Sequence, residues 1–116
     1  MRVAIIGSRS LSSLNLDWLL SHIPPAASEI VSGGAAGVDE YARLAAQATG
    51  LPLREFLPDY ERFGKQAPLR RNIEIIGYSD LVLAFWDGHS RGTIHVAGEC
   101  VKRGVPVRLI EAKTEI

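Results

Sequence analysis

The sequence EIVSGGAAGVD, residues 29–39, runs from a short apolar segment through three glycines into the start of a helix. Glycine allows a tight turn and a close approach of other chain segments at such a junction. The expected helix carries small apolar residues on one face, at Val38, Ala42, Ala45 and Ala48. Gly50 is placed to end this helix as a C-cap. A strand, a glycine-rich turn and an amphipathic helix in this order are typical of a parallel α/β sheet.

The same alternation of strand and helix patterns extends along the chain. Besides residues 29–32, apolar runs predict strands at Val3–Ile6, Leu51–Phe56, Leu81–Trp86 and Pro106–Ile110. Helical spacing is found in residues 16–23, before Pro24-Pro25, in a segment that begins at Pro68, and in residues 94–101, before Gly104. Strands joined by helices pair in parallel through right-handed crossovers. We therefore predict that residues 1–116 form one Rossmann-like α/β domain, a doubly wound, mostly parallel five-stranded sheet flanked by helices.

Composition narrows the possible partners and locations. With 116 residues and 47% hydrophobic content, the chain can bury a core without disulfides or metals. Its single cysteine, Cys100, excludes an internal disulfide and gives no support for a thiolate metal site, so we expect no metal and a reducing, cytoplasmic location. We expect no membrane span and no signal peptide, because no apolar stretch has the required length or position. Thirteen Lys and Arg balance thirteen Asp and Glu, which disfavours a nucleic acid as the main partner.

Three predicted strand-to-helix junctions carry glycine, hydroxyl and arginine residues. They are GSRS at residues 7–10, SGGAAGVD at 32–39 and DGHSRGT at 87–93. The carboxyl ends of parallel strands share one edge of the sheet, where ligands bind in open α/β folds. Helix N-termini and Arg9 would hold a phosphate group there. The same segments are also compatible with purely structural roles: plain turns, close helix–strand packing and an ordinary N-cap at Thr93. Asp39 could either complement the dipole of the helix or bond to a ligand hydroxyl.

The junction at residues 57–67 mixes aromatic and cationic side chains. Tyr60, Arg62, Phe63 and Lys65 lie within it, and Arg70, Arg71 and Asn72 follow. Such a mixture suits an adenine-like ring with phosphates, single-stranded nucleic acid, or simply a solvated start of a helix. The residues that we consider for stacking on a base are Tyr60, Phe63 and Trp86.

The order of these junctions resembles that of SLOG domains, a group that joins the DNA-processing protein A family and the Lonely Guy phosphoribohydrolases. The matching elements are Gly-Ser-Arg, Ser-Gly-Gly-Ala-x-Gly-x-Asp, Arg-Asn and Gly-x-Ser-x-Gly-Thr, spread between Val3 and Ile110. The stand-alone branch related to YspA and YpsA is the most similar. The resemblance implies a nucleotide-derived ligand at these loops. The residues that it assigns to the pocket are Gly7, Ser8, Arg9, Gly33, Gly34, Gly37, Asp39, Arg71, Asn72, Gly88, Ser90, Gly92 and Thr93.

Three functional hypotheses follow. The first, which we favour, is a sensor or binding module for an ADP-ribose-, NAD- or mononucleotide-like compound, with no other cofactor identified. The second is an enzyme that cleaves an N-glycosidic bond of a nucleotide, with Glu99, Asp87 or Asp39 as its carboxylate. Glu99 is a weak candidate, because it does not fall where the Lonely Guy enzymes carry their catalytic glutamate.

The third hypothesis is a single-stranded DNA-binding protein, supported by Arg62, Lys65, Arg70 and Arg71. The resemblance also implies a homo-oligomer formed through helices. Trp18 or Tyr78 would suit such a contact, and both residues suit the core equally well.

Overall fold

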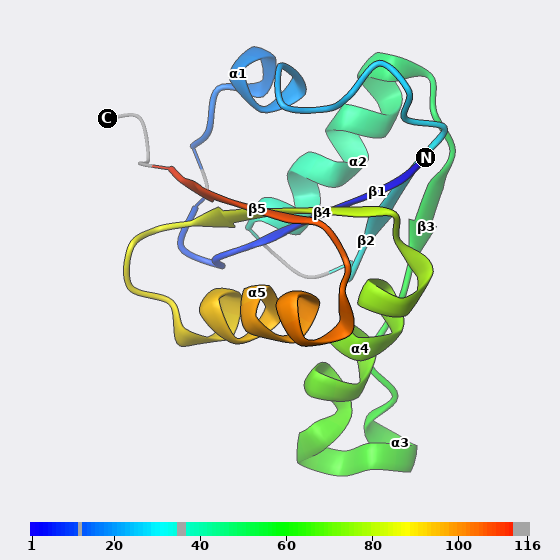
Figure 1. The fold of residues 1–116 in the computed structure, drawn as a ribbon, viewed down its shortest axis with the longest axis vertical. Helices are drawn as coiled ribbons and strands as arrows, with labels where there is room; N and C mark the ends of the chain where they lie inside the picture. Colours follow the sequence, from blue (N-terminus) through cyan, green and yellow to red (C-terminus); the bar gives the residue numbers. More distant parts are fainter. Residues whose placement is uncertain (12, 35–36, 113–116) are drawn as a thin grey trace.

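Every strand expected from the sequence forms in the computed structural model, which describes residues 1–11, 13–34 and 37–112. The strands are β1 (Arg2–Gly7), β2 (Glu29–Ser32), β3 (Leu53–Glu55), β4 (Leu81–Trp86) and β5 (Val107–Glu111). They form one sheet in the order β3-β2-β1-β4-β5, and each neighbouring pair is parallel. The prediction of a doubly wound, Rossmann-like sheet is therefore confirmed (Figure 1).

The longer helices form where the apolar spacing predicts them, although Ala48, Ile94 and Val101 on the predicted apolar faces are exposed. Two short helices were not predicted. The helices are α1 (Leu16–Leu20), α2 (Val38–Thr49), α3 (Tyr60–Phe63), the 3₁₀ helix η1 (Gly64–Gln66), α4 (Ala67–Tyr78) and α5 (Arg91–Arg103). Gly50 and Gly104 end α2 and α5 in the left-handed conformation expected of C-caps. The helix expected to reach residue 23 ends at Leu20. None of the helices in the described residues is long and apolar enough to cross a membrane.

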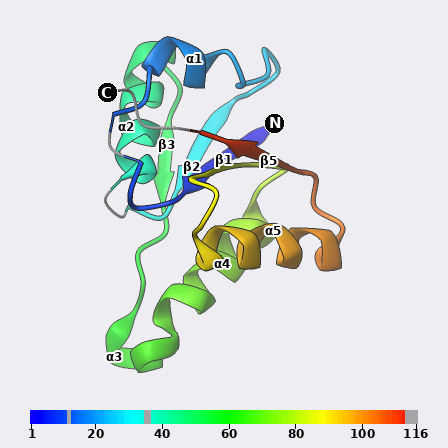
Figure 2. The same ribbon diagram turned by 90° about the vertical axis from the view of Figure 1, so that its left-hand side faces the viewer.

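The sheet separates two apolar layers. Successive side chains of a strand point to opposite faces, so Val3 and Ile5 pack with α1 and α2, whereas Ala4 and Ile6 pack with α4 and α5. Both layers contain fully buried residues from β4, and Phe85 is the largest of them. Figures 1 and 2 show α1 and α2 on one side of the sheet and α4 and α5 on the other, with α3 projecting away from the body.

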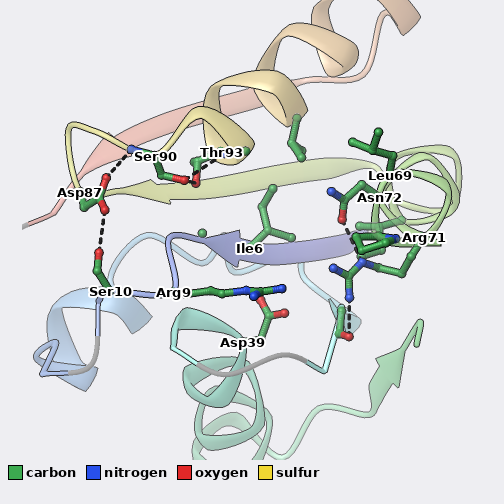
Figure 3. Close-up of a pocket in the computed structure, with 16 residues that line it drawn as sticks. Ile6, Arg9, Ser10, Asp39, Leu69, Arg71, Asn72, Asp87, Ser90 and Thr93 are labelled. Carbon is green, nitrogen blue, oxygen red and sulfur yellow. Dashed lines mark hydrogen bonds between the residues drawn. The ribbon is translucent and has the colours of Figure 1, made fainter. Parts of the chain in front are cut away.

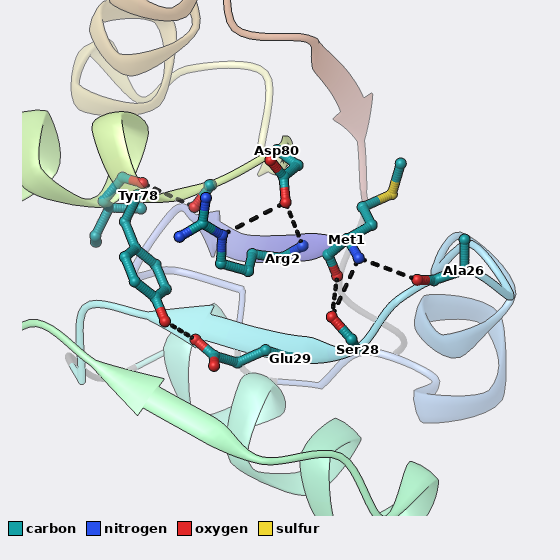
Figure 4. Close-up of polar contacts among 9 residues, drawn as sticks. Met1, Arg2, Ala26, Ser28, Glu29, Tyr78 and Asp80 are labelled. Carbon is teal, nitrogen blue, oxygen red and sulfur yellow. Dashed lines mark hydrogen bonds and ion pairs between the residues drawn. The ribbon is translucent and has the colours of Figure 1, made fainter.

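Polar contacts close the sheet at the amino ends of its strands. The carboxylate of Asp80 accepts from the backbone N–H of Arg2 at 2.7 Å, and this bond holds the pKa of Asp80 below its usual value. Tyr78 donates its hydroxyl to Glu29, and the guanidinium of Arg2 lies 4.5 Å from the centre of the Tyr78 ring (Figure 4). Tyr78, one of the two residues considered as an oligomer contact, is thus part of an intramolecular network. The carboxyl ends of the strands, where ligands bind in open α/β folds, lie at the opposite edge.

Candidate functional site

A pocket of about 460 Å³ opens at the carboxyl ends of β1 and β4. The chain winds from β1 to β2 and β3 on one side and places β4 and β5 on the other, so this is the position where the winding reverses. Figure 3 shows lining side chains on both sides of β1, with α5 at one end of the pocket and α4 at the other. Its volume lies within the range of roughly 300–1,000 Å³ that is typical of small-molecule sites.

The turn after β1 is packed tightly against β4. A β-carbon at Gly7 would lie 2.3 Å from the carbonyl oxygen of Phe85, so a side chain does not fit there. Ser8 is buried, and its hydroxyl accepts from the backbone N–H of Asp87 and pairs with the hydroxyl of Thr93, both at 3.2 Å. These contacts fix the position of the exposed Arg9, which lines the pocket.

Asp87 holds the loop between β4 and α5. Its carboxylate accepts from the Ser10 hydroxyl at 2.6 Å and from the backbone N–H groups of His89 and Ser90 at 2.8 and 2.7 Å. These hydrogen bonds lower the pKa of Asp87 well below its ordinary value, and the bond from Ser10 has the largest effect. The group is therefore a carboxylate at neutral pH and joins the turns that follow β1 and β4.

The N-terminus of α5 faces the pocket. Ser90 is its N-cap and accepts from the backbone N–H of Thr93 at 3.4 Å. The alternative prediction, that Thr93 is the N-cap, is therefore wrong. Thr93 instead contacts Ser8 and Ser90 through its hydroxyl. The first turn of α5 contains no acidic residue, and the carboxylate of Asp87 reaches this positive dipole end through the backbone N–H of Ser90. Ser90, Gly92 and Thr93 line the pocket.

The glycine-rich junction contributes through Gly33 and the start of α2. The carbonyl oxygen of Gly33 accepts from Nη1 of Arg71 at 2.8 Å, and a β-carbon on Gly33 would lie 2.5 Å from that nitrogen and 3.1 Å from Oδ2 of Asp39. Gly37 has a φ of +77° and lies against the backbone of Arg9. Ala35 and Ala36, between them in the motif, lie outside the described residues.

Arg71 is held by hydrogen bonds to Gly33 and Asn72 in the wall of the pocket. Its side chain is 9% exposed, and its Nε donates to Oδ1 of Asn72 at 2.9 Å. Burial lowers the pKa of Arg71, the negative charge of Asp39 opposes that shift, and the positive charge of Arg9 adds to it. The guanidinium thus ties the glycine-rich junction to α4.

The structure brings most of the predicted site residues together. The predicted residues that line the pocket are Gly7, Arg9, Gly33, Asp39, Arg71, Asn72, Ser90, Gly92 and Thr93. Ser8 lies directly behind this lining, bonded to Thr93. Gly34, Gly37 and Gly88 are not part of the lining.

The aromatic candidates and Glu99 lie outside the lining. Trp86 donates its indole N–H to the carbonyl of Ser90, and Phe63 has the guanidinium groups of Arg62 and Arg70 at 5.0 and 5.1 Å from its ring centre. Tyr60 is 58% exposed at the start of α3. Glu99 pairs with Arg103 and Lys102 along α5.

Other lining residues were not predicted for the site. They are Ile6, Ser10, Pro68, Leu69, Ile75, Asp87 and Val96. Ser10 and Asp87 lie within the quoted junctions, and Asp87 was proposed there only as a catalytic carboxylate. Ile6, Ile75 and Val96 are buried, and the pocket opens where the core that they belong to reaches the edge of the sheet. In the described part of the chain, no group of three or more His, Cys, Asp or Glu is placed to hold a metal ion.

Comparison with known proteins identifies the family. The model of the YspA, cpYpsA-related SLOG family matches residues 1–63, just over half of the 116 residues. The chain belongs to this SLOG family. The match includes the turn after β1 and the glycine-rich junction and ends at the last residue of α3. The resemblance read from the junctions is thus confirmed.

A curated relative spans nearly the whole SLOG chain. The Gene 61 protein of Mycobacterium phage D29 is 37% identical, and the alignment covers 91% of this chain and 93% of the phage protein. No solved structure gave a significant match. The similarity to this relative therefore extends beyond residue 63, where the match to the family model ends. The name of the phage protein states no activity.

Proposed function

We propose that this SLOG chain binds a nucleotide-derived, phosphate-bearing small molecule in the pocket between β1 and β4. Membership of the SLOG family indicates a role in binding or processing nucleotide-related ligands. The observation that carries the proposal is the convergence of an exposed cation, Arg9, and the N-terminus of α5, whose first turn contains no acidic residue, on one pocket of about 460 Å³. The proposed ligands are ADP-ribose-, NAD- or mononucleotide-like, and the proposed role is that of a sensor or binding module.

The chemistry of the two groups is complementary to a phosphate. A helix N-terminus contributes about 0.3–1 kcal/mol to binding of a negative group at an exposed site. A hydrogen bond from a guanidinium to a phosphate oxygen adds about 1.5–3 kcal/mol. The contacts of Asp87 and Ser8 hold the two turns in place before the ligand arrives, which reduces the entropy lost on binding.

Calorimetric titration with AMP, NAD and ADP-ribose tests the proposal. We expect at least one to bind, and Arg9→Gln to weaken that binding roughly 10- to 100-fold because a charged hydrogen bond is lost. Arg108→Gln is the matched control, since Arg108 is an exposed cation on β5 outside the pocket lining. If none of these compounds binds at millimolar concentration, or if both variants weaken binding equally, the proposal is wrong.

The positions of the carboxylates support binding more than hydrolysis. Glu99 is outside the lining and paired with Arg103, and Asp87 accepts hydrogen bonds that keep it ionised and thus unsuited to act as an acid. Asp39 lines the pocket beside Gly33. Chromatography of the same nucleotides after incubation would reveal any release of free base. Native mass spectrometry of the purified protein would report the proposed homo-oligomer and any retained ligand together.

A further inference from the structure

We propose that Asn72 is a specificity-determining residue of this pocket and selects ligands whose heterocyclic base carries a carbonyl oxygen in place of an exocyclic amine. The inference rests on the proposed function. It concerns the end of the pocket formed by α4, opposite the N-terminus of α5 (Figure 3).

The contact between Arg71 and Asn72 fixes which way the Asn72 amide points. Nε of Arg71 lies 2.9 Å from Oδ1 of Asn72. A guanidinium has only donors, so the atom that faces it must be the amide oxygen and not the nitrogen. The amide nitrogen is thereby turned away from Arg71, and Figure 3 shows it directed to the interior of the pocket. Asn72 thus directs its two N–H donors into the pocket, while its oxygen is turned to Arg71 and uses one lone pair there.

Arg71 itself has little freedom to release that amide. Its Nη1 donates to the carbonyl of Gly33 at 2.8 Å, and the side chain is 9% exposed. A rotation of the Asn72 amide by 180° would place its NH₂ group against the guanidinium and leave donors facing donors. Arg71 is therefore a positioning residue, and Asn72 is the group that would touch the ligand.

The surroundings of Asn72 suit a base better than a phosphate. Pro68, Leu69 and Ile75 line the same end of the pocket, which gives a flat ring apolar contact. Ser90, Gly92 and Thr93, at the N-terminus of α5, line the other end, where the proposed phosphate would lie. With its phosphate there, a nucleotide extends its base toward α4, because the pocket runs between these two helices.

A pair of N–H donors directed into the pocket, with the amide oxygen turned toward Arg71, discriminates between bases. A carbonyl oxygen on the base accepts from the Asn72 amide, whereas an amino group brings a second donor to the same place and leaves both unpaired. Sites that hydrogen-bond a polar substituent reject analogues that cannot complete the bond. IMP and AMP provide the matched probes, because they have the same sugar and phosphate, and the main difference at the base is an oxo or an amino group at one ring position.

The test compares the IMP-to-AMP affinity ratio in three forms of the protein. We expect the wild type to bind IMP about tenfold more tightly than AMP. Asn72→Asp keeps one oxygen for Nε of Arg71 and presents the other as an acceptor, so the ratio should invert in favour of AMP. The added charge weakens both nucleotides alike, which is why the ratio is the readout. Asn72→Ser, which removes the donor pair and adds no charge, should bring the ratio close to one.

The outcomes separate this inference from the proposed function. Equal affinities in the wild type, a preference for AMP, or an unchanged ratio in Asn72→Ser would overturn the role of Asn72 while leaving a nucleotide-binding pocket. Absence of binding of AMP, NAD, ADP-ribose and IMP to the wild type would overturn the proposed function itself. Thermal unfolding of each variant checks that it is folded, and the serine variant keeps the test decisive if the aspartate variant is not.

Discussion

Gly7 and Gly98 are glycines in opposite surroundings. A β-carbon at Gly7 would lie 2.3 Å from the backbone oxygen of Phe85, whereas none of the atoms described comes within 4 Å of one at Gly98, inside α5. Gly7→Ala should lower the free energy of unfolding by about 1–3 kcal/mol, because the strand or the turn must shift. Gly98→Ala should raise it by up to about 1 kcal/mol, because alanine is the better helix former. Urea titration measures both, and equal effects would contradict the close packing of β1 against β4.

His22 is partly buried, and its Nε2 atom is shielded from solvent. In the described ranges, its Nε2 has no hydrogen-bond partner, and the ring lies against Trp18 and Phe85 with centroids 4.9 and 5.9 Å away. His22→Phe should raise the free energy of unfolding at neutral pH by about 1 kcal/mol, because an aromatic ring is kept and the unsatisfied nitrogen is removed. If His22→Phe instead lowers the free energy of unfolding in urea titration, Nε2 of His22 has a hydrogen-bond partner in solution.

At the scale of the elements, Asp87 makes the loop between β4 and α5 sensitive to acid. The native pKa is lowered, first by the Ser10 hydroxyl, so the unfolded chain, with a pKa of about 3.9 for aspartate, takes up its proton at higher pH than the folded chain. The stability contributed by Asp87 is therefore complete above about pH 4 and is lost as the pH falls toward the native pKa.

Unfolding measured between pH 7 and pH 2 tests this dependence. The free energy of unfolding of Asp87→Asn should fall less steeply in acid than that of the wild type. Ser10→Ala, which removes the first cause of the shift, should raise the native pKa of Asp87 as followed by NMR. Parallel pH profiles for the wild type and Asp87→Asn would show that these hydrogen bonds do not form in solution.

Sequence patterns predicted the elements better than the contacts between them. Long amphipathic stretches and glycine caps sufficed for α2 and α5, because these signals are local. The four-residue helix α3 is too short to show a period, and it appeared only as an aromatic and cationic junction. Glycine and arginine marked the edge of the sheet, but the role of Asp87 depends on Ser10, which is 77 positions away in the chain. Leu69 lines the pocket because α4 packs beside β1, and no local sequence pattern indicates that packing.

At the scale of the whole molecule, the pocket joins two halves of the sheet. β1, β2 and β3 lie on one side of the reversal, and β4 and β5 lie on the other. The hydrogen bonds from Ser8 and Ser10 to the loop that begins at Asp87 cross this boundary. A ligand that touches Arg9 and Gly92 would cross it as well, so binding should be coupled to the stability of both halves.

Hydrogen exchange of the free and ligand-bound protein measures this coupling. A ligand present at 100 times its Kd raises the free energy of unfolding by about 2.7 kcal/mol when it binds the folded state alone. Because the contacts lie on both sides of the reversal, slower exchange should appear in the turn after β1 and in the first turn of α5 together. Arg9→Gln, at the same ligand concentration, should reduce the protection of both segments. Protection confined to one of them would place the ligand on one half of the sheet and contradict binding at the reversal.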